Sequence, residues 1–249
     1  MAKAIEARDL SKTFRLPHER RTTLKEHFLH PFRQIDYEVN EALGNVSFDV
    51  EEGEFFSVIG PNGSGKSTLL KILAGIYRAD SGEVHVHGKL SPFIELGVGF
   101  NTELTARDNV RINATLLGLS KRDLQQRYEE IVAFAELERF MDQKLKNFSS
   151  GMQVRLAYAI AIQVDFDILL LDEVLAVGDG EFQEKCMETF EQLRAAGKTI
   201  VFVSHDLGTV AHFSDRVLYI DGGRAVALGP AEEVVACYLD AHGLAPSAF

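Results

Sequence analysis

The sequence GPNGSGKS, residues 60–67, contains the residues of this chain that are best suited to chemistry. It matches the pattern G-x-x-x-x-G-K-[ST], in which glycines allow backbone amides to wrap closely around phosphate groups. An apolar run at 55–60 leads into it and a helical pattern at 66–76 follows, which is the setting that the pattern requires. We therefore predict a site for the phosphates of a nucleotide. Its residues are Gly60, Pro61, Asn62, Gly63, Ser64, Gly65, Lys66, Ser67 and Thr68.

Three side chains at the end of this loop have distinct expected roles. Lys66 carries a positive charge that pairs with the β- and γ-phosphates. Ser67 offers a hydroxyl ligand for Mg²⁺, and Thr68 offers a hydroxyl near the α-phosphate. The alternative is a glycine-rich turn that binds nothing, and the Lys-Ser pair between a strand and a helix argues against it.

Two further strand-like runs end in polar residues. The run ILLLDE, residues 168–173, delivers Asp172 and Glu173 to the carboxyl end of a strand. Asp172 suits a contact to Mg²⁺, and Glu173 suits a general base or a carboxylate that positions water. His205, at the end of TIVFVSH, could reach a γ-phosphate from a neighbouring strand. Neither run is specific alone, because apolar strands often end in acids and a lone histidine is usually structural. Their combination with the phosphate loop makes the prediction specific.

Apolar runs of strand length alternate with helical patterns along most of the chain. The segment FQEKCMETFEQL, residues 182–193, lies between two such runs and has apolar residues at helical spacing. This alternation predicts an α/β fold with a parallel sheet and with ligands at the carboxyl ends of its strands. Residues 106–162 lack strand-like runs, so we expect a helical subdomain there. No repeat or flexible linker divides the sequence, which we interpret as one domain over residues 1–249.

The composition disfavours several classes of protein. Hydrophobic residues make up 46% and charged residues 25% of the 249, as in ordinary globular domains. The net charge of −11 argues against a nucleic acid partner, since phosphate contacts need clustered lysine and arginine. Cys186 and Cys237 lack metal-ligand spacing, and we expect free thiols in a reducing compartment. We expect neither a signal peptide nor a membrane span, so a role at a membrane would require a partner.

The segment NFSSGMQVRLAYA, residues 147–159, narrows the choice of family. It resembles LSGGQ, the signature of ATP-binding-cassette (ABC) proteins, in a degenerate form, and it precedes the Asp172 strand at that family's spacing. A serine hydroxyl and glycine amides at a helix start form an anion site, which has no phosphate of its own in a monomer. The resemblance covers essentially the whole chain and implies a homodimer with two ATP molecules sandwiched head to tail. The residues expected to act across that interface are Ser149, Ser150, Gly151, Gln153 and Asp179.

The resemblance implies a fold, cofactors and roles for individual residues. The fold is the α/β P-loop NTPase fold of ABC ATPases, with a RecA-like core, an antiparallel β subdomain and a helical signature subdomain. The cofactors are ATP and Mg²⁺, and the metal ligands are Ser67 and Asp172. The catalytic positions are Lys66, Glu173 and His205. The adenine-stacking aromatic is Phe14, with Tyr37 as the alternative because a basic segment looks inserted after the first strand.

Three stretches are similar to those of ABC proteins that export polysaccharides: ELGVGF at 95–100, an inserted helix at about 20–33 and DEVLAVGD at 172–179. The similarity implies the ATP-hydrolysing subunit of an exporter for a lipid-linked polymer of the O-antigen, teichoic acid or galactan type. Such a subunit works peripherally with a separate permease dimer at the cytoplasmic face of the cell (inner) membrane. Some relatives carry a C-terminal carbohydrate-binding domain, and we expect none here because the sequence ends at Phe249.

The stretch ELGVGF also occupies the place of a glutamine that many ABC proteins use to sense the nucleotide. Its glycines allow a tight turn and its apolar side chains offer contact surface, so one hypothesis places it against the permease. The residues concerned are Glu95, Leu96, Gly97, Gly99 and Phe100. The alternative is a hairpin that packs on its own domain. A basic helix at 22–32 would either lie near anionic headgroups or dock as an ordinary surface helix.

Other functions remain open from the sequence. An importer or a different exporter would share every nucleotide motif, and only the ELGVGF run and the basic insertion argue against an importer. A soluble ABC ATPase that acts on DNA or ribosomes typically has two cassettes in one chain or long coiled-coil insertions, and this sequence has neither. A P-loop kinase or GTPase would not need the FSSGMQ segment at a helix start.

Overall fold

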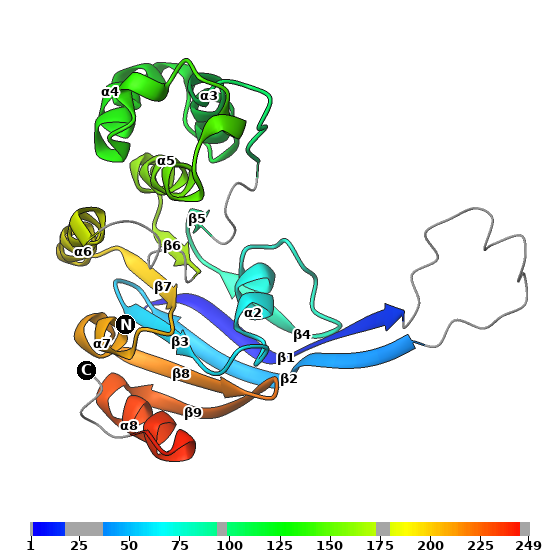
Figure 1. The fold of residues 1–249 in the computed structure, drawn as a ribbon. Helices are drawn as coiled ribbons and strands as arrows, with labels where there is room; N and C mark the ends of the chain where they lie inside the picture. Colours follow the sequence, from blue (N-terminus) through cyan, green and yellow to red (C-terminus); the bar gives the residue numbers. More distant parts are fainter. Residues whose placement is uncertain (1, 18–36, 94–98, 173–179, 245–249) are drawn as a thin grey trace, which may run out of the picture.

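The computed structural model describes residues 2–17, 37–93, 99–172 and 180–244 (Figure 1). Within them the strands form two sheets. The first is a three-stranded antiparallel sheet of order β2-β1-β4, and its strands are β1 (Lys3–Pro17), β2 (Tyr37–Glu51) and β4 (Ser81–Val86). The second has six strands in the order β5-β6-β7-β3-β8-β9. They are β3 (Phe55–Ile59), β5 (Leu90–Phe93), β6 (Ile168–Leu171), β7 (Thr199–Val203), β8 (Arg216–Asp221) and β9 (Arg224–Pro230).

The six-stranded sheet is parallel from β5 to β8, and only β9 runs antiparallel to its neighbour. The α/β fold with a parallel sheet and a separate antiparallel sheet is therefore confirmed. The strands are shorter than the apolar runs that predicted them: β3 ends at Ile59, β6 at Leu171 and β7 at Val203. Asp172 and His205, from the ends of two of these runs, follow the strands at the edge of the sheet where ligands bind.

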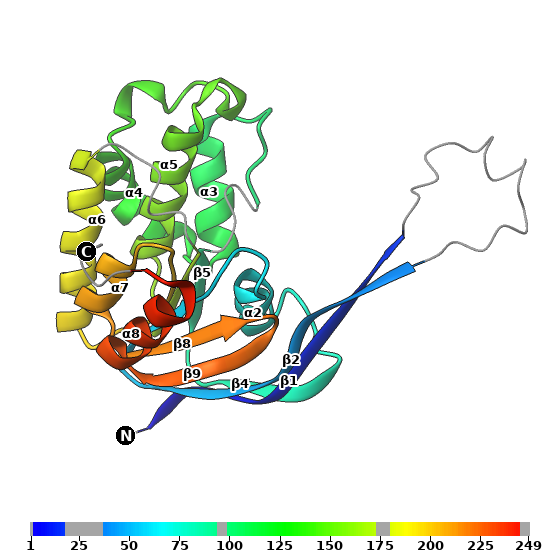
Figure 2. The same ribbon diagram turned by 60° about the horizontal axis from the view of Figure 1, so that its bottom comes forward.

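Helices cover both faces of the parallel sheet and also form a separate group (Figures 1 and 2). The helices are α2 (Lys66–Leu73), α3 (Ala106–Leu116), α4 (Lys121–Ala135), α5 (Ser150–Gln163), α6 (Gly180–Ala195), α7 (Leu207–Phe213) and α8 (Ala231–His242). Two short 3₁₀ helices, Glu138–Phe140 and Leu145–Asn147, connect α4 to α5. The helices α3, α4 and α5 lie together, away from the antiparallel sheet, in the part of the chain where a helical subdomain was expected.

Strand β3 shows how the parallel sheet separates two hydrophobic cores. Phe55 and Ile59 face the core formed with α6, α7 and α8, while Phe56 and Val58 face the core formed with α2 and the antiparallel sheet. This alternation follows from the two-residue period of a strand. Phe56 stacks on Phe48 of β2 with ring centroids 5.5 Å apart, so the antiparallel sheet is packed directly onto the parallel one. A strand with both faces buried is almost entirely apolar, and in this one the exception is Ser57, whose buried hydroxyl is hydrogen-bonded to Ser214 at 2.6 Å.

The helical group has a hydrophobic core of its own, which includes Val110, Ile131 and Leu156. Two buried asparagines on α3 connect that core to the chain that enters it. The Asn109 Oδ1 accepts a hydrogen bond from the Asn101 amide at 2.7 Å, and its Nδ2 donates to the Thr105 carbonyl at 2.8 Å. One turn later, the Asn113 Nδ2 donates to the Gly99 carbonyl at 3.2 Å. The two side chains therefore hold residues 99–105 against α3.

Several expectations concern residues that lie outside the described ranges. These include the basic helix at 20–33, Glu95, Leu96, Gly97, Glu173 and Asp179. Among the described helices, none combines the length and the apolar character that crossing a membrane requires. Both cysteines are free thiols, and burial raises the pKa of Cys186 to about 12, so this thiol stays protonated at neutral pH.

We expect Asn109→Ala to destabilise the protein by about 2 kcal/mol, because the hydrogen bonds that the buried Asn109 side chain makes with the Asn101 amide and the Thr105 carbonyl would be lost. Chemical denaturation of the purified chain measures this change. The matched control is Asn147→Ala, the same truncation at an exposed position, which should change stability by less than about 0.5 kcal/mol. Equal stability of the two variants would contradict a role for Asn109 in holding this segment.

Candidate nucleotide site

The phosphate loop, residues 60–67, is pressed between two strands that belong to different sheets. A Cβ on Gly60 would lie 2.0 Å from the Ile220 carbonyl oxygen of β8. A Cβ on Gly65 would lie 2.3 Å from the Ala42 carbonyl oxygen of β2, and its φ of +110° is itself unfavourable for other residues. Neither position has room for a side chain. Because glycine has no side chain, the backbone at these two positions can approach its neighbours, and a ligand, more closely than the backbone of any other residue could.

The chemistry of the loop fits a phosphate ligand. The buried Lys66 ammonium donates to the carbonyls of Gly60 and Pro61, at 2.8 and 3.0 Å, so the charge is held inside the curve of the loop. Helix α2 begins at Lys66, so its first backbone amides lie at the end of the loop. The positive end of the helix dipole there adds to the charge of the lysine. The Ser64 hydroxyl is buried and has no hydrogen-bond partner among the described residues. This arrangement of donors suits the oxygens of a polyphosphate.

A cavity of about 300 Å³ opens over the loop. It is lined by Phe14, Asn40, Ala42, Asn62, Gly63, Ser64, Gly65, Lys66, Ser67 and Thr68. Phe14 is thus the predicted aromatic residue that borders the phosphate loop. Tyr37, the alternative, pairs with Pro17 at the far end of the β1–β2 ribbon, away from the body of the molecule, and it does not line this cavity (Figures 1 and 2).

Phe14 is positioned by an ion pair on the same strand. The Lys12 ammonium lies 2.7 Å from Oδ1 of Asp80, and the Thr13 amide donates to its Oδ2 at 2.7 Å. The hydrogen bond from Lys12, followed by that from Thr13, lowers the pKa of the Asp80 carboxyl. Phe14 itself packs edge-on against Tyr77, with ring centroids 5.5 Å apart. These contacts fix the strand on which the candidate adenine-stacking ring lies.

The strand order places three predicted groups at one edge of the parallel sheet. The phosphate loop follows β3, Asp172 follows β6, and His205 comes soon after the end of β7, which lies between the other two strands. Because the carboxyl ends of parallel strands meet at the same edge, these residues share the loop's side of the sheet. Asp172 is buried and its amide donates to the Phe93 carbonyl at 3.0 Å, whereas His205 is exposed.

The signature residues lie apart from this cavity, at the start of α5. The Ser149 hydroxyl accepts a hydrogen bond from the Met152 amide at 3.2 Å and so caps the helix. Ser149 and Ser150 are exposed, and Gly151 has almost no crowding around its α-carbon. The Gln153 amide is turned back toward the Leu145 and Phe148 carbonyls. None of these residues lines the cavity over the phosphate loop.

Glu136 ties the signature helix to α6. Its carboxylate lies 3.1 Å from Arg155 of α5 and 3.1 Å from Lys185 of α6. The Lys185 ammonium also donates to the Phe134 carbonyl at 2.9 Å, and the Arg155 guanidinium lies 4.8 Å from the Phe182 ring centroid. Three helices therefore converge on one carboxylate. The start of α5 is held in a fixed relation to the helix that follows residues 173–179.

Of the stretch ELGVGF, the structure describes Gly99 and Phe100. The Gly99 carbonyl accepts the hydrogen bond from Asn113, and a Cβ at Gly99 would lie 2.6 Å from Asn113 Oδ1. Phe100 is partly buried and packs against the core of the helical group. This end of the stretch is thus held on its own subdomain. Leu96, Gly97 and Glu95 lie outside the described residues.

Residues that the sequence did not indicate also shape the site. Asn40 and Ala42 of β2 line the cavity, and the Ile220 carbonyl of β8 borders Gly60. No local motif marks them, because they contribute through backbone atoms or through a position on an otherwise ordinary strand. Gly223 adds a further link: its amide donates to the Ser64 carbonyl and its carbonyl accepts from the Gly44 amide.

Comparison with known proteins is consistent with this geometry. A family model described as "ABC transporter" matches residues 43–176. The O-antigen export system ATP-binding protein RfbB of Klebsiella pneumoniae is 40% identical over 244 residues, which are 97% of this chain and 99% of that protein. The teichoic acids export ATP-binding protein TagH of Bacillus anthracis is 36% identical over 94% of this chain but only 42% of its own length.

The fold has a close match among solved structures. One is titled as the dimeric structure of a post-hydrolysis state of the ATP-binding cassette MJ0796 bound to ADP and Pi. It has a TM-score of 0.74 and 27% identity, and the match covers 91% of this chain and 98% of that one. That relative is a dimer and holds the products of ATP hydrolysis.

We expect Gly65→Ala to lower ATP affinity at least about tenfold, because the new methyl group would collide with the Ala42 carbonyl and displace the loop. Equilibrium binding of a fluorescent ATP analogue measures this loss. The control is Gly75→Ala, at a φ of +72° with no atom close to the added Cβ. It carries similar backbone strain, about 1–2 kcal/mol, without a collision at the loop, and should bind ATP normally. Normal ATP affinity in Gly65→Ala would show that the close approach is not needed.

Proposed function

This chain belongs to the ABC transporter family of ATPases, and on that premise we propose that it powers the export of a lipid-linked cell-envelope polysaccharide through a separate permease. The observation that carries the proposal is similarity over nearly the whole chain to O-antigen export subunits, combined with a complete phosphate loop. The polymer class is of the O-antigen, teichoic acid or galactan type. The subunit would lie at the cytoplasmic face of the cell membrane, bound to a permease dimer.

Within one subunit, the phosphate loop binds and orients ATP. Lys66 and the amides at the start of α2 hold the β- and γ-phosphates, Thr68 lies near the α-phosphate, and Phe14 stacks on the adenine. Ser67 and Asp172 would hold Mg²⁺, which neutralises charge on the phosphates when it is bound. The oxygen donors of these two residues suit this hard cation.

Hydrolysis then requires a positioned water and a means of stabilising the charge that develops on the γ-phosphate. We assign the water to Glu173, which directly follows Asp172 in the sequence, as general base. His205, which closely follows the strand between β6 and β3, would contact the γ-phosphate. Lys66 compensates the transferring phosphoryl group, because such reactions depend mainly on positioning and electrostatics.

A second copy of the chain would complete each site. Ser149 and Ser150 are exposed and Gly151 is half-buried at the start of α5, and none of them lines the cavity of their own chain. A helix start with free space around it suits an anion presented by another molecule. We infer that these residues, with Gln153 and Asp179 nearby in the interface, contact the nucleotide held by the partner subunit. The dimeric relative supports this assembly.

Coupling to the permease would involve the stretch that contains Gly99 and Phe100. The hydrogen bond from Asn113 fixes Gly99 on α3, so Gly99 would move with the helical group. We propose that Glu95, Leu96, Gly97, Gly99 and Phe100 respond to, or contact, the cytoplasmic side of the permease. Phe100 packs against the core of the helical group, so it would hold one end of this stretch in place.

Complementation between two inactive variants tests the shared site. Lys66→Ala removes the phosphate-loop charge, and Ser149→Asp keeps a good helix cap but places a negative charge opposite the partner's γ-phosphate. We expect each variant alone to lose ATPase activity about 10²-fold or more. A random mixture should recover roughly a quarter of the wild-type rate, since half of the dimers contain one complete site.

The control for this experiment mixes Lys66→Ala with Glu173→Gln. Both changes damage the site that the same chain holds, so a mixed dimer has no complete site and activity should stay low. Recovery in this control, or none in the first mixture despite dimers in gel filtration, would contradict a site shared between subunits.

Replacing Glu173 by glutamine in cells that contain the permease tests the proposed cargo. ATP binding should persist while hydrolysis falls at least about 10²-fold, the typical effect of losing a general base. Polysaccharide should disappear from the cell surface and lipid-linked polymer should accumulate inside, as measured by surface labelling and lipid extraction. Glu188→Gln on the exposed side of α6 is the control and should export normally. Slow hydrolysis together with normal surface polymer would support the proposed ATPase activity but contradict polysaccharide as the exported cargo.

A further inference from the structure

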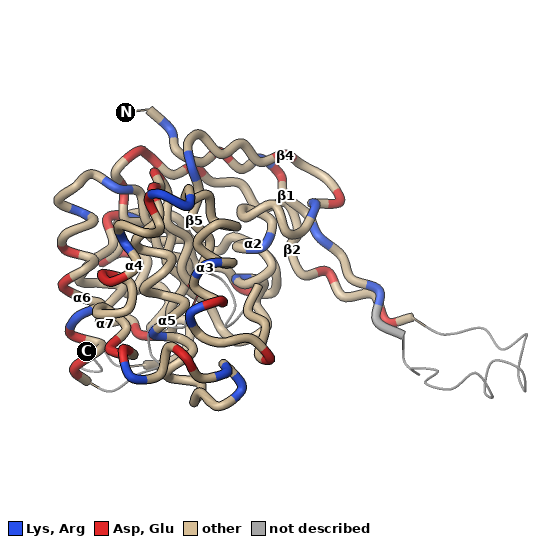
Figure 3. Tube along the Cα trace, turned by 90° about the horizontal axis from the view of Figure 1, so that it is seen from above, with Lys and Arg blue, Asp and Glu red and all other residues tan. Residues whose placement is uncertain are grey.

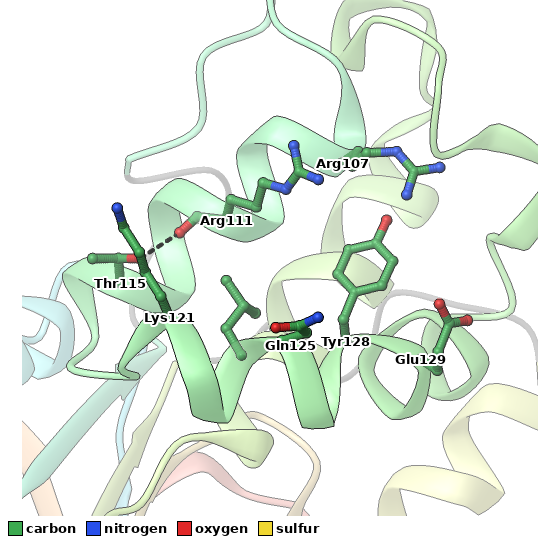
Figure 4. Close-up of a pocket in the computed structure, with 8 residues that line it drawn as sticks. Arg107, Arg111, Thr115, Lys121, Gln125, Tyr128 and Glu129 are labelled. Carbon is green, nitrogen blue, oxygen red and sulfur yellow. Dashed lines mark hydrogen bonds between the residues drawn. The ribbon is translucent and has the colours of Figure 1, made fainter.

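A second concave site lies between α3 and α4, on the helical group (Figure 4). Its volume is about 670 Å³, within the range of pockets that bind small organic ligands. It shares no residue with the cavity over the phosphate loop. Its lining residues are Arg107, Arg111, Thr115, Lys121, Leu124, Gln125, Tyr128 and Glu129.

The lining of the pocket holds more basic than acidic side chains although the chain as a whole is acidic. Figure 3 shows lysine and arginine spread among aspartate and glutamate over the described trace. Here Arg107, Arg111 and Lys121 line one cavity, and Glu129 is the carboxylate among the described lining residues. Asp142 and Asp108 pair with the two arginines from outside the lining. Basic groups gathered in a cleft attract anions, and those with weak or no acidic partners contribute most.

Two of these cations make weak polar contacts, or none, with the rest of the described residues. Arg111 lies 3.4 Å from Asp108 and its side chain is 60% exposed, so that ion pair is long and hydrated. Lys121 makes no hydrogen bond or ion pair with the described residues. Arg107 differs, because its Nε donates to Asp142 at 2.8 Å, which leaves the outer guanidinium nitrogens for a further acceptor.

Tyr128 gives an independent indication of a ligand. Its hydroxyl oxygen is shielded from solvent and has no hydrogen-bond partner among the described residues. Figure 4 shows this hydroxyl pointing toward α3, between the side chains of Arg107 and Arg111. Burial raises the pKa of Tyr128, so the group stays a neutral donor at physiological pH. A buried donor without an acceptor is costly, and an anion oxygen arriving in the pocket would satisfy it.

Access to that hydroxyl requires one side chain to move. The Arg107 guanidinium lies 5.5 Å from the centroid of the Tyr128 ring and covers it. An anion that bonds to the outer nitrogens of Arg107 would draw this flexible side chain outward and bring an oxygen to the hydroxyl. The ring of Tyr128 and the side chain of Leu124 then remain as apolar walls for the organic part of the ligand.

We propose that the pocket between α3 and α4 binds a phosphate-bearing organic anion, with Arg111 and Lys121 at the phosphate and Tyr128 as an additional donor. The donors come from both helices, with Lys121 and Tyr128 toward opposite ends of the pocket (Figure 4), and such spread donors suit a phosphate with several oxygens better than a planar carboxylate. The ligand is either a phospholipid headgroup or a soluble phosphate ester, which present the same chemistry. The proposal does not depend on the exported cargo.

The test uses the full chain with saturating Mg-ADP, so that the phosphate loop is already filled. Glycerol 3-phosphate is the soluble probe, measured by calorimetry. Vesicles of phosphatidylcholine with or without phosphatidylglycerol are the lipid probe, measured by co-sedimentation. Binding of glycerol 3-phosphate assigns a soluble ester, and binding only to phosphatidylglycerol vesicles assigns a headgroup. Binding to neither probe overturns the proposal.

Variants then locate any binding in the pocket. Combined Arg111→Gln and Lys121→Gln should weaken it about tenfold or more, while Arg122→Gln, an exposed neighbour outside the pocket, should have a much smaller effect. Tyr128→Phe should weaken it about fivefold, because only one hydrogen bond is lost. Glu129→Gln should strengthen binding, a change that misfolding cannot imitate. Wild-type affinity in the double variant, or weaker binding in Glu129→Gln, would overturn the proposal.

Discussion

The close approach of the phosphate loop to two strands is the constraint on which the rest of the structure depends. Gly60 lies against the Ile220 carbonyl and Gly65 against the Ala42 carbonyl, at separations that exclude any Cβ. These carbonyls belong to different sheets, so the loop holds the antiparallel sheet to the parallel sheet at the site itself. The stacking of Phe48 on Phe56 fixes the same relation deeper in the core. The geometry of the phosphate site therefore follows from how the two sheets pack.

The helical group is joined to this core by an apolar seam along α5 and by polar contacts. Val154, Tyr158 and Ala161 of α5 are buried in the same core as the parallel sheet. The Tyr158 ring lies 5.7 Å from that of Phe93 and 6.3 Å from that of Phe182, measured between ring centroids. Polar contacts add to the seam, since Asn113 holds Gly99 at the entry to α3 and Glu136 joins α5 to α6. The start of α5 is therefore fixed on the sheet by packing as well as by charge.

The α3–α4 pocket extends this view of the helical group. Its two arginines, Arg107 and Arg111, lie on the side of α3 opposite the buried Asn109 and Asn113. One face of α3 therefore connects to the coupling stretch while another offers charge to an outside ligand. A ligand held between α3 and α4 would act on the same helix that positions Gly99. The pocket and Gly99 are thus held by the same helix.

The sequence by itself determined the phosphate loop, the acidic end of β6 and the α/β class, because these depend on short-range stereochemistry and on the periodicity of apolar residues. It left open whether Phe14 or Tyr37 lies at the phosphate loop, and in the structure Phe14 lines the cavity over the loop while the long β1–β2 ribbon carries Tyr37 away from it. Only the tertiary structure placed β7 between β6 and β3, and so His205 at the same edge of the sheet as the phosphate loop and Asp172. It alone revealed Asn40, Ala42 and the Tyr128 pocket. The physical reason is that strand order and helix packing arise from contacts between residues far apart in the chain, which no local pattern records.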